Sequence, residues 1–465
     1  MSTPETIKGL WWITGKDQPA RSGTLNISST DLRLSIWEHQ QLTVEEVVLR
    51  AAQDETQHVS RVVYGRDEHD KPVTLFGCSI GEWGFSAGLQ KFEIDALAAV
   101  RGLEIESWST PIARAVLIRP GLLHRWLGRN LIVSSKTEDG KAAFIPVEGL
   151  DLLFPLEPGI KIRFCEVASP SSSSDEFRFC PDSQIWFHFD EPRSISEIRD
   201  LWVPWVTRLL GLLIGTAVWK EEVRIFTVDP FEKGISIIDR EGELLPIGSR
   251  TGPVRLSDPH ARNMVAPFEA IREQLGGIVA EWHRVCRRLK PVVDLFATVS
   301  LHHNMFMEAR FLFLVQTLEI YHVCSDRFES RELPKHKHEE WLAIALEALP
   351  ANLHDWAKGK LQLNFRSLFQ KLVDIFKAHE AEAVRLFGNL EEAASRIAYT
   401  RNYYTHYHED ADKGRLIPER KMFGICFALE AMLWLILLRE LKLEGRSVES
   451  VVRRAEGLKF VLLDS

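Results

Sequence analysis

The segment "GSRTGPVRLSDPH", residues 248–260, separates two parts of the chain whose hydrophobic residues follow different patterns. Before it, short apolar runs are punctuated by Gly, Pro, Asn, Asp and Ser at intervals typical of β-hairpins. After it, long stretches such as "FRSLFQKLVDIFKAH" repeat their apolar residues with the period of about 3.6 that is typical of helices. We therefore predict an α+β multidomain fold.

Two domains are predicted on either side of this segment. Residues 1–255 form a β-rich region of sandwich-like or barrel-like type, and residues 261–465 form an all-α helical bundle. A chain of 465 residues is too long for one ordinary core, so the β-rich region has room for two subdomains. Within it, Ser196 is the predicted N-cap of a helix near residues 196–214.

The composition is that of a soluble globular protein, with 45% hydrophobic and 26% charged residues. The opening "MSTPETIKGLWWITG" lacks the basic and apolar regions of a secretory signal. The six cysteines are scattered without a CxxC pair, which predicts reduced thiols in a cytoplasmic protein. The net charge of −8 gives no overall attraction to nucleic acid, so contact with RNA requires a local basic patch.

One apolar stretch, "LWVPWVTRLLGLLIGTAVW" at residues 201–219, has about the length of a membrane span. It contains Pro204, Arg208 and two glycines, and its flanks are polar. A charged residue such as Arg208 is unfavourable at the centre of a bilayer. We predict a buried helix that runs into a strand, and no membrane contact.

The segment "TRNYYTHYHED", residues 400–410, concentrates polar and titratable groups within the helical half. On a regular helix Asn402 and His406 lie on one face, whereas Arg401 and His406 are separated by roughly 140° and about 7.5 Å of rise. Arg401 and His406 can therefore meet at one phosphate only if the helix loosens or a second copy completes the site. The charged residues that follow predict that the helix ends near His406.

These residue types suit the cleavage of RNA. RNA carries its own nucleophile, the 2′-hydroxyl, beside the phosphate that is cut. Cleavage then needs an acid or base with a pKa near neutrality, which histidine supplies, and a fixed cation, which a guanidinium supplies. Asn402 could orient the imidazole. This chemistry needs neither a metal nor a cofactor, and we expect none.

The stretch "RNYYTH", residues 401–406, resembles the Arg-x-x-x-x-His motif of HEPN-superfamily ribonucleases. The order of a β-rich region opening "GLWWITGKDQPARSGTLNIS" and a helical domain is similar to the ApeA family of bacterial anti-phage abortive-infection proteins. The resemblance covers both halves of the chain. It implies a metal-independent endoribonuclease with Arg401 and His406 catalytic and Asn402 supporting.

The resemblance also implies partners. The substrate would be RNA, with transfer RNA as one candidate, and two HEPN domains would form a composite site in a homodimer built through the helical domain. The N-terminal region would sense a phage-derived trigger and restrain the nuclease until infection. HEPN bundles often carry an acidic residue on an earlier helix, so Glu319, which interrupts an apolar stripe in "ARFLFLVQTLEIYHVCSDR", is the expected partner of Arg401.

A basic cluster, "HRVCRRLKP" at residues 283–291, contains Arg284, Arg287 and Arg288. These three arginines are candidates for RNA phosphate contacts, but a solvated face balanced by nearby acids is equally consistent with the pattern. His408, followed by Glu409 and Asp410, does not have the spacing at which helical ligands converge on a metal, and we expect it at the surface.

Two other functions remain open at this point. The helical domain could be a catalytically silent HEPN scaffold whose β-rich region binds a protein or a ligand. Arg401 and His406 would then belong to a solvated helix face. A carbohydrate-binding or hydrolytic β-domain is a weaker alternative, because no paired-carboxylate site can be placed from the sequence.

Overall fold

The computed structural model describes most of the chain, namely residues 5–13, 19–28, 31–38, 61–86, 89–128, 132–136, 142–172, 177–232, 240–245, 263–301, 305–362, 364–407 and 412–463. The chain divides into two compact units, Met1–Val279 and Ala280–Ser465. The predicted boundary segment at residues 248–260 lies outside the described residues.

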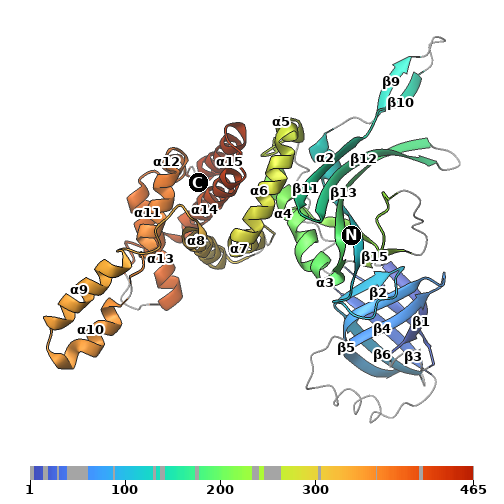
Figure 1. Cartoon of the computed structure of the whole chain (residues 1–465), viewed down its shortest axis with the longest axis horizontal. Coiled ribbons are helices and arrows are strands. Elements are labelled where there is room, and N and C mark those ends of the chain that lie inside the picture. The colour runs from blue at the N-terminus through green and yellow to red at the C-terminus, as the bar shows by residue number, and fades with distance from the viewer. Residues whose placement is uncertain are drawn as a thin grey trace. The chain divides into compact units, whose positions relative to one another are not determined.

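The first unit is β-rich, and its strands are β1 (Glu5–Trp12), β2 (Arg21–Ile27), β3 (Leu32–Glu38), β4 (Arg61–Asp67), β5 (Pro72–Ser86), β6 (Leu89–Ala96), β7 (Ala98–Arg101), β8 (Pro111–Pro120), β9 (Ile132–Lys136), β10 (Ala142–Pro146), β11 (Leu150–Glu157), β12 (Ile160–Ser172), β13 (Phe177–Ser194), β14 (Lys220–Phe226) and β15 (Glu241–Leu245). The strands of the large sheet are hydrogen-bonded in the order β11-β12-β13-β8-β14-β15-β7-β5-β4-β1-β2-β3-β6. Because β6 pairs with both β3 and β5, the last six strands close into an antiparallel barrel (Figure 1).

The barrel is filled by the alternate residues of its strands that face inward. Trp11, from the "GLWWITG" opening, is fully buried among them. A Cβ atom at Gly65 would lie 2.3 Å from the Trp11 ring, so only glycine leaves space for that ring. The predicted β-rich region is confirmed, and its first part is a closed barrel with a sheet continuing from it.

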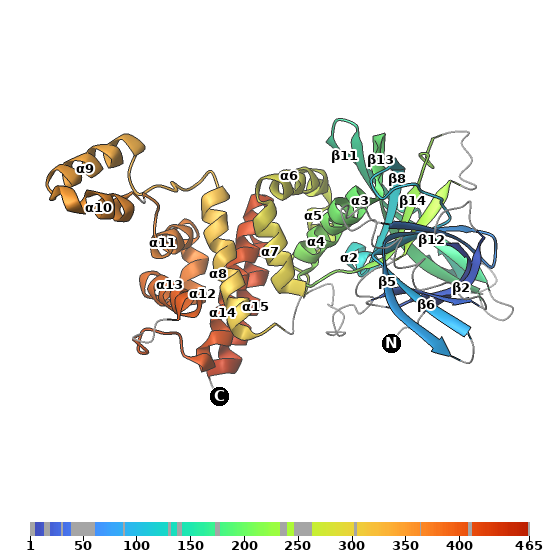
Figure 2. The ribbon, with the colours of Figure 1, turned by 90° about the horizontal axis from the view of Figure 1, so that it is seen from below.

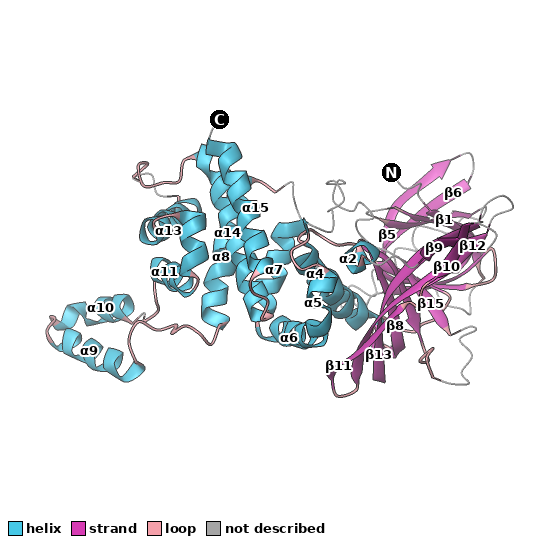
Figure 3. Ribbon diagram, turned by 90° about the horizontal axis from the view of Figure 1, so that it is seen from above, coloured by secondary structure: helices cyan, strands magenta, loops and turns pink. Residues whose placement is uncertain are grey.

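Helices cover one face of the remaining sheet (Figure 3). They are α3 (Ile195–Glu197), the π-helical turn η1 (Ile198–Trp202) and α4 (Val203–Ile214), while the short α2 (Leu123–Leu127) lies beside β13. Phe187 of β13 packs against Trp202 and Trp205, with ring centroids 4.9 and 5.8 Å apart. α4 is buried and leads to β14, as predicted for residues 201–219.

The N-cap of this helical segment differs from the prediction. Ser194, not Ser196, accepts from the backbone N–H of Glu197 at 3.2 Å, and the Glu197 carboxylate accepts in return from the Ser194 backbone N–H, also at 3.2 Å. This reciprocal capping box needs a Glu or Gln three positions after the cap. Ser194 has one at that position and Ser196 does not.

The second unit is helical, as predicted, and the helices from the end of the first unit onward are α5 (Phe268–Ile271), η3 (Arg272–Gln274), α6 (Leu275–Arg288), α7 (Lys290–Leu301), α8 (Met307–Cys324), α9 (Lys335–Glu347), η4 (Ala351–Leu353), α10 (His354–Leu361), α11 (Leu368–Ala378), α12 (Glu380–Phe387), α13 (Leu390–His406), α14 (Glu419–Glu440) and α15 (Arg446–Leu463). α8 packs against α7, α11, α13 and α14, and α14 also packs against α15. The hairpin of α9 and α10 projects from this bundle (Figure 2).

Among the helices that the structure describes, α14 alone has the length and hydropathy to cross a membrane, and 61% of its most apolar window is buried.

None of the cysteines that the structure describes takes part in a disulfide bond; they are Cys78, Cys165, Cys286, Cys324 and Cys426. Burial raises the pKa of the Cys78 and Cys426 thiols to about 12, so both are unreactive at neutral pH.

His379, between α11 and α12, makes the stability of the helical unit depend on pH. It is 2% exposed and contacts the Arg439 guanidinium, so burial and then that positive charge lower its pKa to about 4. An unfolded histidine has a pKa of about 6.5, so the unfolded chain binds a proton first as the pH falls. The stabilising contribution is therefore complete above about pH 6.5 and is lost as the pH falls towards 4.

We predict that His379→Gln removes this pH dependence while keeping an acceptor for Arg439. Between pH 7 and pH 5 the wild-type chain should lose on the order of 2 kcal/mol more of its free energy of unfolding than the variant does. Urea denaturation of the full chain, followed by circular dichroism of the helical signal, measures both losses. Equal losses would show that His379 does not set the dependence.

Candidate active site

The motif residues lie at the C-terminal end of α13. Asn389 caps the start of this helix by accepting from the backbone N–H of Glu392 at 3.1 Å. Tyr407 closes it with a left-handed backbone, φ 47°, and donates its N–H to the Tyr403 carbonyl. The prediction that the helix ends at His406 is confirmed. Because the chain stays helical through His406, the side chains of Arg401 and His406 leave the helix in directions about 140° apart.

Arg401 belongs to a row of three charged groups from three helices, Arg401, Glu319 and Lys371, which we call the charged row. Its Nη2 donates to Oε2 of Glu319 on α8 at 3.2 Å, and Oε1 of Glu319 accepts from Nζ of Lys371 on α11 at 2.9 Å. Figure 2 shows these three helices side by side. The side chains are 23%, 21% and 11% exposed, respectively, so water screens the row only partly. The structure thus places Glu319 where the sequence expected it, beside Arg401.

Asn402 also contacts the guanidinium. Its Oδ1 accepts from Nη1 of Arg401 at 3.2 Å, whereas the sequence had suggested an orienting contact with the imidazole. Thr405 donates its hydroxyl to the Arg401 carbonyl at 2.8 Å. Asn402, Thr405 and His406 are exposed, so the end of α13 presents the motif at the surface of this chain.

Lys371 is a site residue that the sequence alone did not reveal. It lies on an amphipathic helix, and nothing local to α11 marks it as different from other lysines. The sequence feature that could have indicated Lys371 is a matching spacing on two helices. Glu319 and His322 are three residues apart on α8, and their partners, Lys371 and Asp374, are three residues apart on α11. The second pair is also formed, with His322 Nε2 2.9 Å from Asp374 Oδ2. Two polar pairs therefore join α8 to α11 below the motif.

Tyrosines surround the end of the helix. Tyr403 and Tyr407 stack with their ring centroids 5.5 Å apart, and Tyr407 is 73% exposed. Tyr404 instead packs edge-on against Phe311 of α8, at 6.4 Å. An exposed aromatic ring such as that of Tyr407 is a surface on which an unpaired nucleobase can stack.

Family comparisons match both halves of the chain. Residues 6–282 match the family described as ApeA N-terminal domain 1, and residues 312–446 match the one described as Apea-like HEPN. The chain belongs to the ApeA family. No curated protein and no solved structure gave a match.

The HEPN match of this ApeA-family chain includes every member of the charged row and the whole 401–406 motif. Membership supports a HEPN nuclease-type role in anti-phage defence, since the HEPN family generally implies ribonuclease activity. The recognition of an ApeA-like protein from its sequence is confirmed.

The described part of the connector from α13 to α14, residues 412–418, folds back on α13 just before the motif. The backbone N–H of Ile417 donates to Oγ1 of the buried Thr400 at 3.0 Å, and that of Asp412 donates to the Tyr399 hydroxyl at 2.7 Å. Arg415 lies over the Tyr399 ring, 4.4 Å from its centroid. His408, Glu409 and Asp410 lie outside the described residues, so their predicted surface position stays a prediction.

The three predicted RNA-contacting arginines, Arg284, Arg287 and Arg288, all line a separate cleft. Arg284 pairs with Glu281 at 2.8 Å, and Arg288 pairs with Asp326 at 3.2 Å and with Glu440. The cleft, of about 650 Å³, is lined by both of these arginines together with Glu281, Val285, Arg287, Arg327, Arg439, Glu440 and Lys442. Basic residues outnumber acids there, but none of the lining residues belongs to the motif or to the charged row.

The charged row yields a prediction on stability. Glu319→Gln should lower the free energy of unfolding by about 1–2 kcal/mol, because Arg401 and Lys371 then face each other without the carboxylate between them. Combining it with Lys371→Met should cost less than the sum of the two single changes, with a coupling of about 1 kcal/mol. Urea denaturation of the full chain measures all three variants.

Glu339→Gln is the matched control, since Glu339 on α9 is 62% exposed and lies 3.8 Å from Lys335. That change should alter the free energy of unfolding by less than about 0.5 kcal/mol. A Glu319 variant no less stable than this control, with no coupling to Lys371, would contradict the row as a structural unit.

Proposed function

We propose that the protein is a metal-independent endoribonuclease that acts in abortive infection, with Arg401 and His406 as its catalytic residues. The observation that carries the proposal is the guanidinium of Arg401, fixed by Glu319 and Asn402 at the surface-exposed end of the helix that also carries His406. A guanidinium held in place before substrate arrives is suited to stabilise charge that develops on a phosphate.

The proposed reaction is a transesterification in which O2′ displaces O5′ of the next nucleotide from phosphorus. His406 in its neutral form accepts the proton of the 2′-hydroxyl, and O2′ forms a bond to phosphorus as the bond to O5′ breaks. The imidazolium formed in this way donates its proton to the departing O5′. Arg401 binds the non-bridging oxygens, on which negative charge builds up. The products are a 2′,3′-cyclic phosphate, or the 3′-phosphate formed from it by water, and a 5′-hydroxyl.

A homodimer is proposed to assemble the site. Because α13 remains helical through His406, one chain directs its guanidinium and its imidazole to different sides. A two-fold axis next to the end of α13 would place the Arg401 of each chain near the His406 of the other, which gives two equivalent Arg–His combinations. The stacked tyrosines, the half-buried Tyr403 and the exposed Tyr407, would hold the bases that flank the cut.

The β-rich unit is proposed to sense a phage-derived trigger and to restrain the nuclease in its absence. Support comes from the family, in which the same N-terminal domain accompanies the HEPN domain. A ribonuclease without restraint would degrade the RNA of its own host. Transfer RNA is one candidate substrate, since its single-stranded loops expose bases that can be splayed out for recognition.

We predict that Arg401→Ala and His406→Ala each lower the rate of RNA cleavage about 100-fold or more while leaving the fold intact. Overexpression of the wild-type chain to a level that escapes this restraint should arrest growth, and neither variant should do so. Because a phage-derived trigger is proposed to release the nuclease, cleavage is followed with protein purified from phage-infected cells. That protein is given labelled RNA in the presence of a metal chelator, and the new 5′ ends are tested for a free hydroxyl.

Arg446→Ala and His336→Ala are matched controls, because both residues are exposed and lie away from the motif. These two variants should cleave like wild type. Full cleavage by the Arg401 and His406 variants would show that the helical unit is a silent scaffold, and 5′-phosphate ends would show a different reaction.

A further inference from the structure

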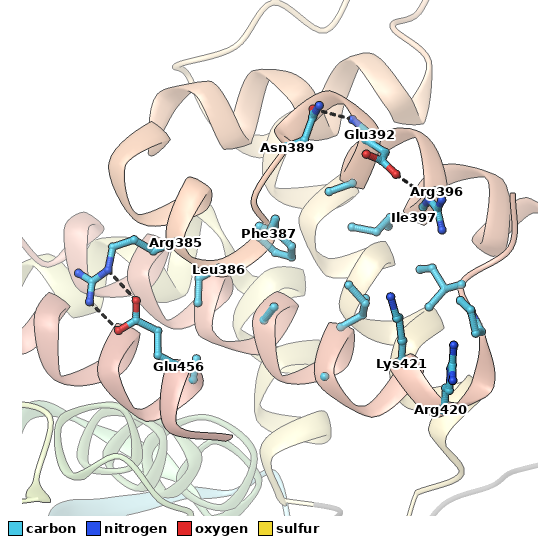
Figure 4. A pocket seen from close by; sticks show the side chains of 17 residues that line it. Arg385, Leu386, Phe387, Asn389, Glu392, Arg396, Ile397, Arg420, Lys421 and Glu456 are labelled. Carbon is cyan, nitrogen blue, oxygen red and sulfur yellow. Dashed lines mark hydrogen bonds and ion pairs between the residues drawn. The ribbon is translucent and has the colours of Figure 1, made fainter. Parts of the chain in front are cut away.

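A second cavity, of about 350 Å³, lies within the helical unit (Figure 4). Ile417 and Pro418, at the end of the connector from α13 to α14, form part of its wall. It is enclosed by the end of α12, the first half of α13, the connector, the first turns of α14 and part of α15. Much of its wall is apolar, formed by side chains such as Leu386, Ile397, Ile417 and Ile425. Its volume is at the lower end of the range found for small-molecule sites.

Gly424 keeps this cavity open. It lies inside α14, where glycine is less favourable than alanine by about 1 kcal/mol. A Cβ atom at Gly424 would meet no other atom within 4 Å, so neither a tight turn nor a neighbouring side chain requires glycine here. The neighbouring wall positions Ala393 and Ala428 are small as well. The chain thus accepts a less stable helix in exchange for space.

The charge around the cavity is positive and lies mainly at one end. Its lining contains four basic and two acidic side chains. Arg385 is held by Glu456 at 2.7 Å and by Glu449 at 2.8 Å, and Arg396 is held by Glu392 at 3.1 Å.

Arg420 and Lys421 account for the net positive charge of the lining, because its other two basic residues are paired with acids. Both are exposed, and no ion pair to either side chain is found in the part of the chain that the structure describes. Figure 4 shows them on the side of Arg396, with the Arg385–Glu456 pair at the opposite end. Both belong to the first turn of α14, where the positive end of the helix dipole adds to their charge.

We propose that this cavity binds a small organic anion that has an apolar body. The body would lie over Gly424 and against Ile397, and the negative group would pair with Arg420 and Lys421. An apolar floor supplies affinity by excluding water, and these two cations select a charged ligand over a neutral one of the same shape.

Such a ligand would contact the connector that holds the end of α13. Ile417 lines the cavity, and its backbone N–H is bonded to Thr400, the residue before Arg401. Occupancy would therefore stabilise the backbone from which the motif projects. That consequence for RNA cleavage rests on the proposed function, whereas binding itself does not.

The test uses the full chain and the fluorescent probe anilinonaphthalene sulfonate, which combines an aromatic body with a sulfonate. Wild-type protein should bind one equivalent saturably. Gly424→Leu adds a side chain whose Cβ meets no neighbouring atom within 4 Å, and it should abolish this binding by occupying the cavity. Leucine also has a higher helix propensity than glycine, so the helix itself should not be weakened. Arg420→Gln combined with Lys421→Gln should weaken binding of the sulfonate about tenfold, and should leave binding of the neutral probe phenylnaphthylamine unchanged.

Two control proteins complete the test. One shows whether exposed aromatic surfaces take up the probe, and the other shows whether probe binding is independent of RNA cleavage. Trp341→Ala combined with Trp356→Ala removes the exposed tryptophans of the α9–α10 hairpin and should not affect binding of the sulfonate. Arg401→Ala should bind it like wild type, so the site can be scored even if no RNA is cleaved. Binding that survives Gly424→Leu, or that disappears with the hairpin tryptophans, would overturn the proposal.

Discussion

The structure of the helical unit depends on one constraint, which is that α13 remains a helix up to His406. A left-handed residue at Tyr407 then ends it, so the motif is neither unwound nor buried. One consequence is rigidity, because Arg401 and His406 are fixed by the helical repeat rather than by a loop. The other is incompleteness, because the same repeat directs the two side chains apart. Because α13 does not loosen before His406 and the two groups diverge, we propose that a second copy of the chain completes the site.

The charged row of Arg401, Glu319 and Lys371 explains how a polar site is maintained among packed helices. An isolated charge in the groove between α8, α11 and α13 would be costly, and a single ion pair there would gain little over apolar packing. A carboxylate bonded on both oxygens, by cations from two other helices, is better compensated. The His322–Asp374 pair one turn further along repeats this arrangement, with Arg366 also donating to Asp374 at 3.0 Å. The polar contacts therefore fix how the three helices sit against one another, and with that the direction of the guanidinium.

Local patterns predicted much of this chain, and long-range pairing explains what they missed. The helices, the buried segment at 201–219 and the end of α13 could be predicted because apolar spacing and capping residues are local. Closure of the barrel could not, since it depends on β6 pairing with both β3 and β5. Glu319 was predicted because it interrupts an apolar stripe and because the resembled HEPN bundles often carry an acidic residue on an earlier helix. Lys371 lies on an ordinary amphipathic helix and is distinguished only by its partner. The Ser194 cap was within reach, because its acidic partner is three residues away in sequence.

The shared site is tested most directly by the activity of a mixed assembly. Chains carrying Arg401→Ala and chains carrying His406→Ala are produced together with different tags, and the population that contains both is purified and given RNA. If the site is shared across a two-fold axis, a mixed dimer keeps one intact Arg–His combination of the two, and its activity should return to about half that of the wild-type dimer. A mixed dimer as inactive as either variant alone would contradict the shared site and, with it, the role assigned here to the end of α13.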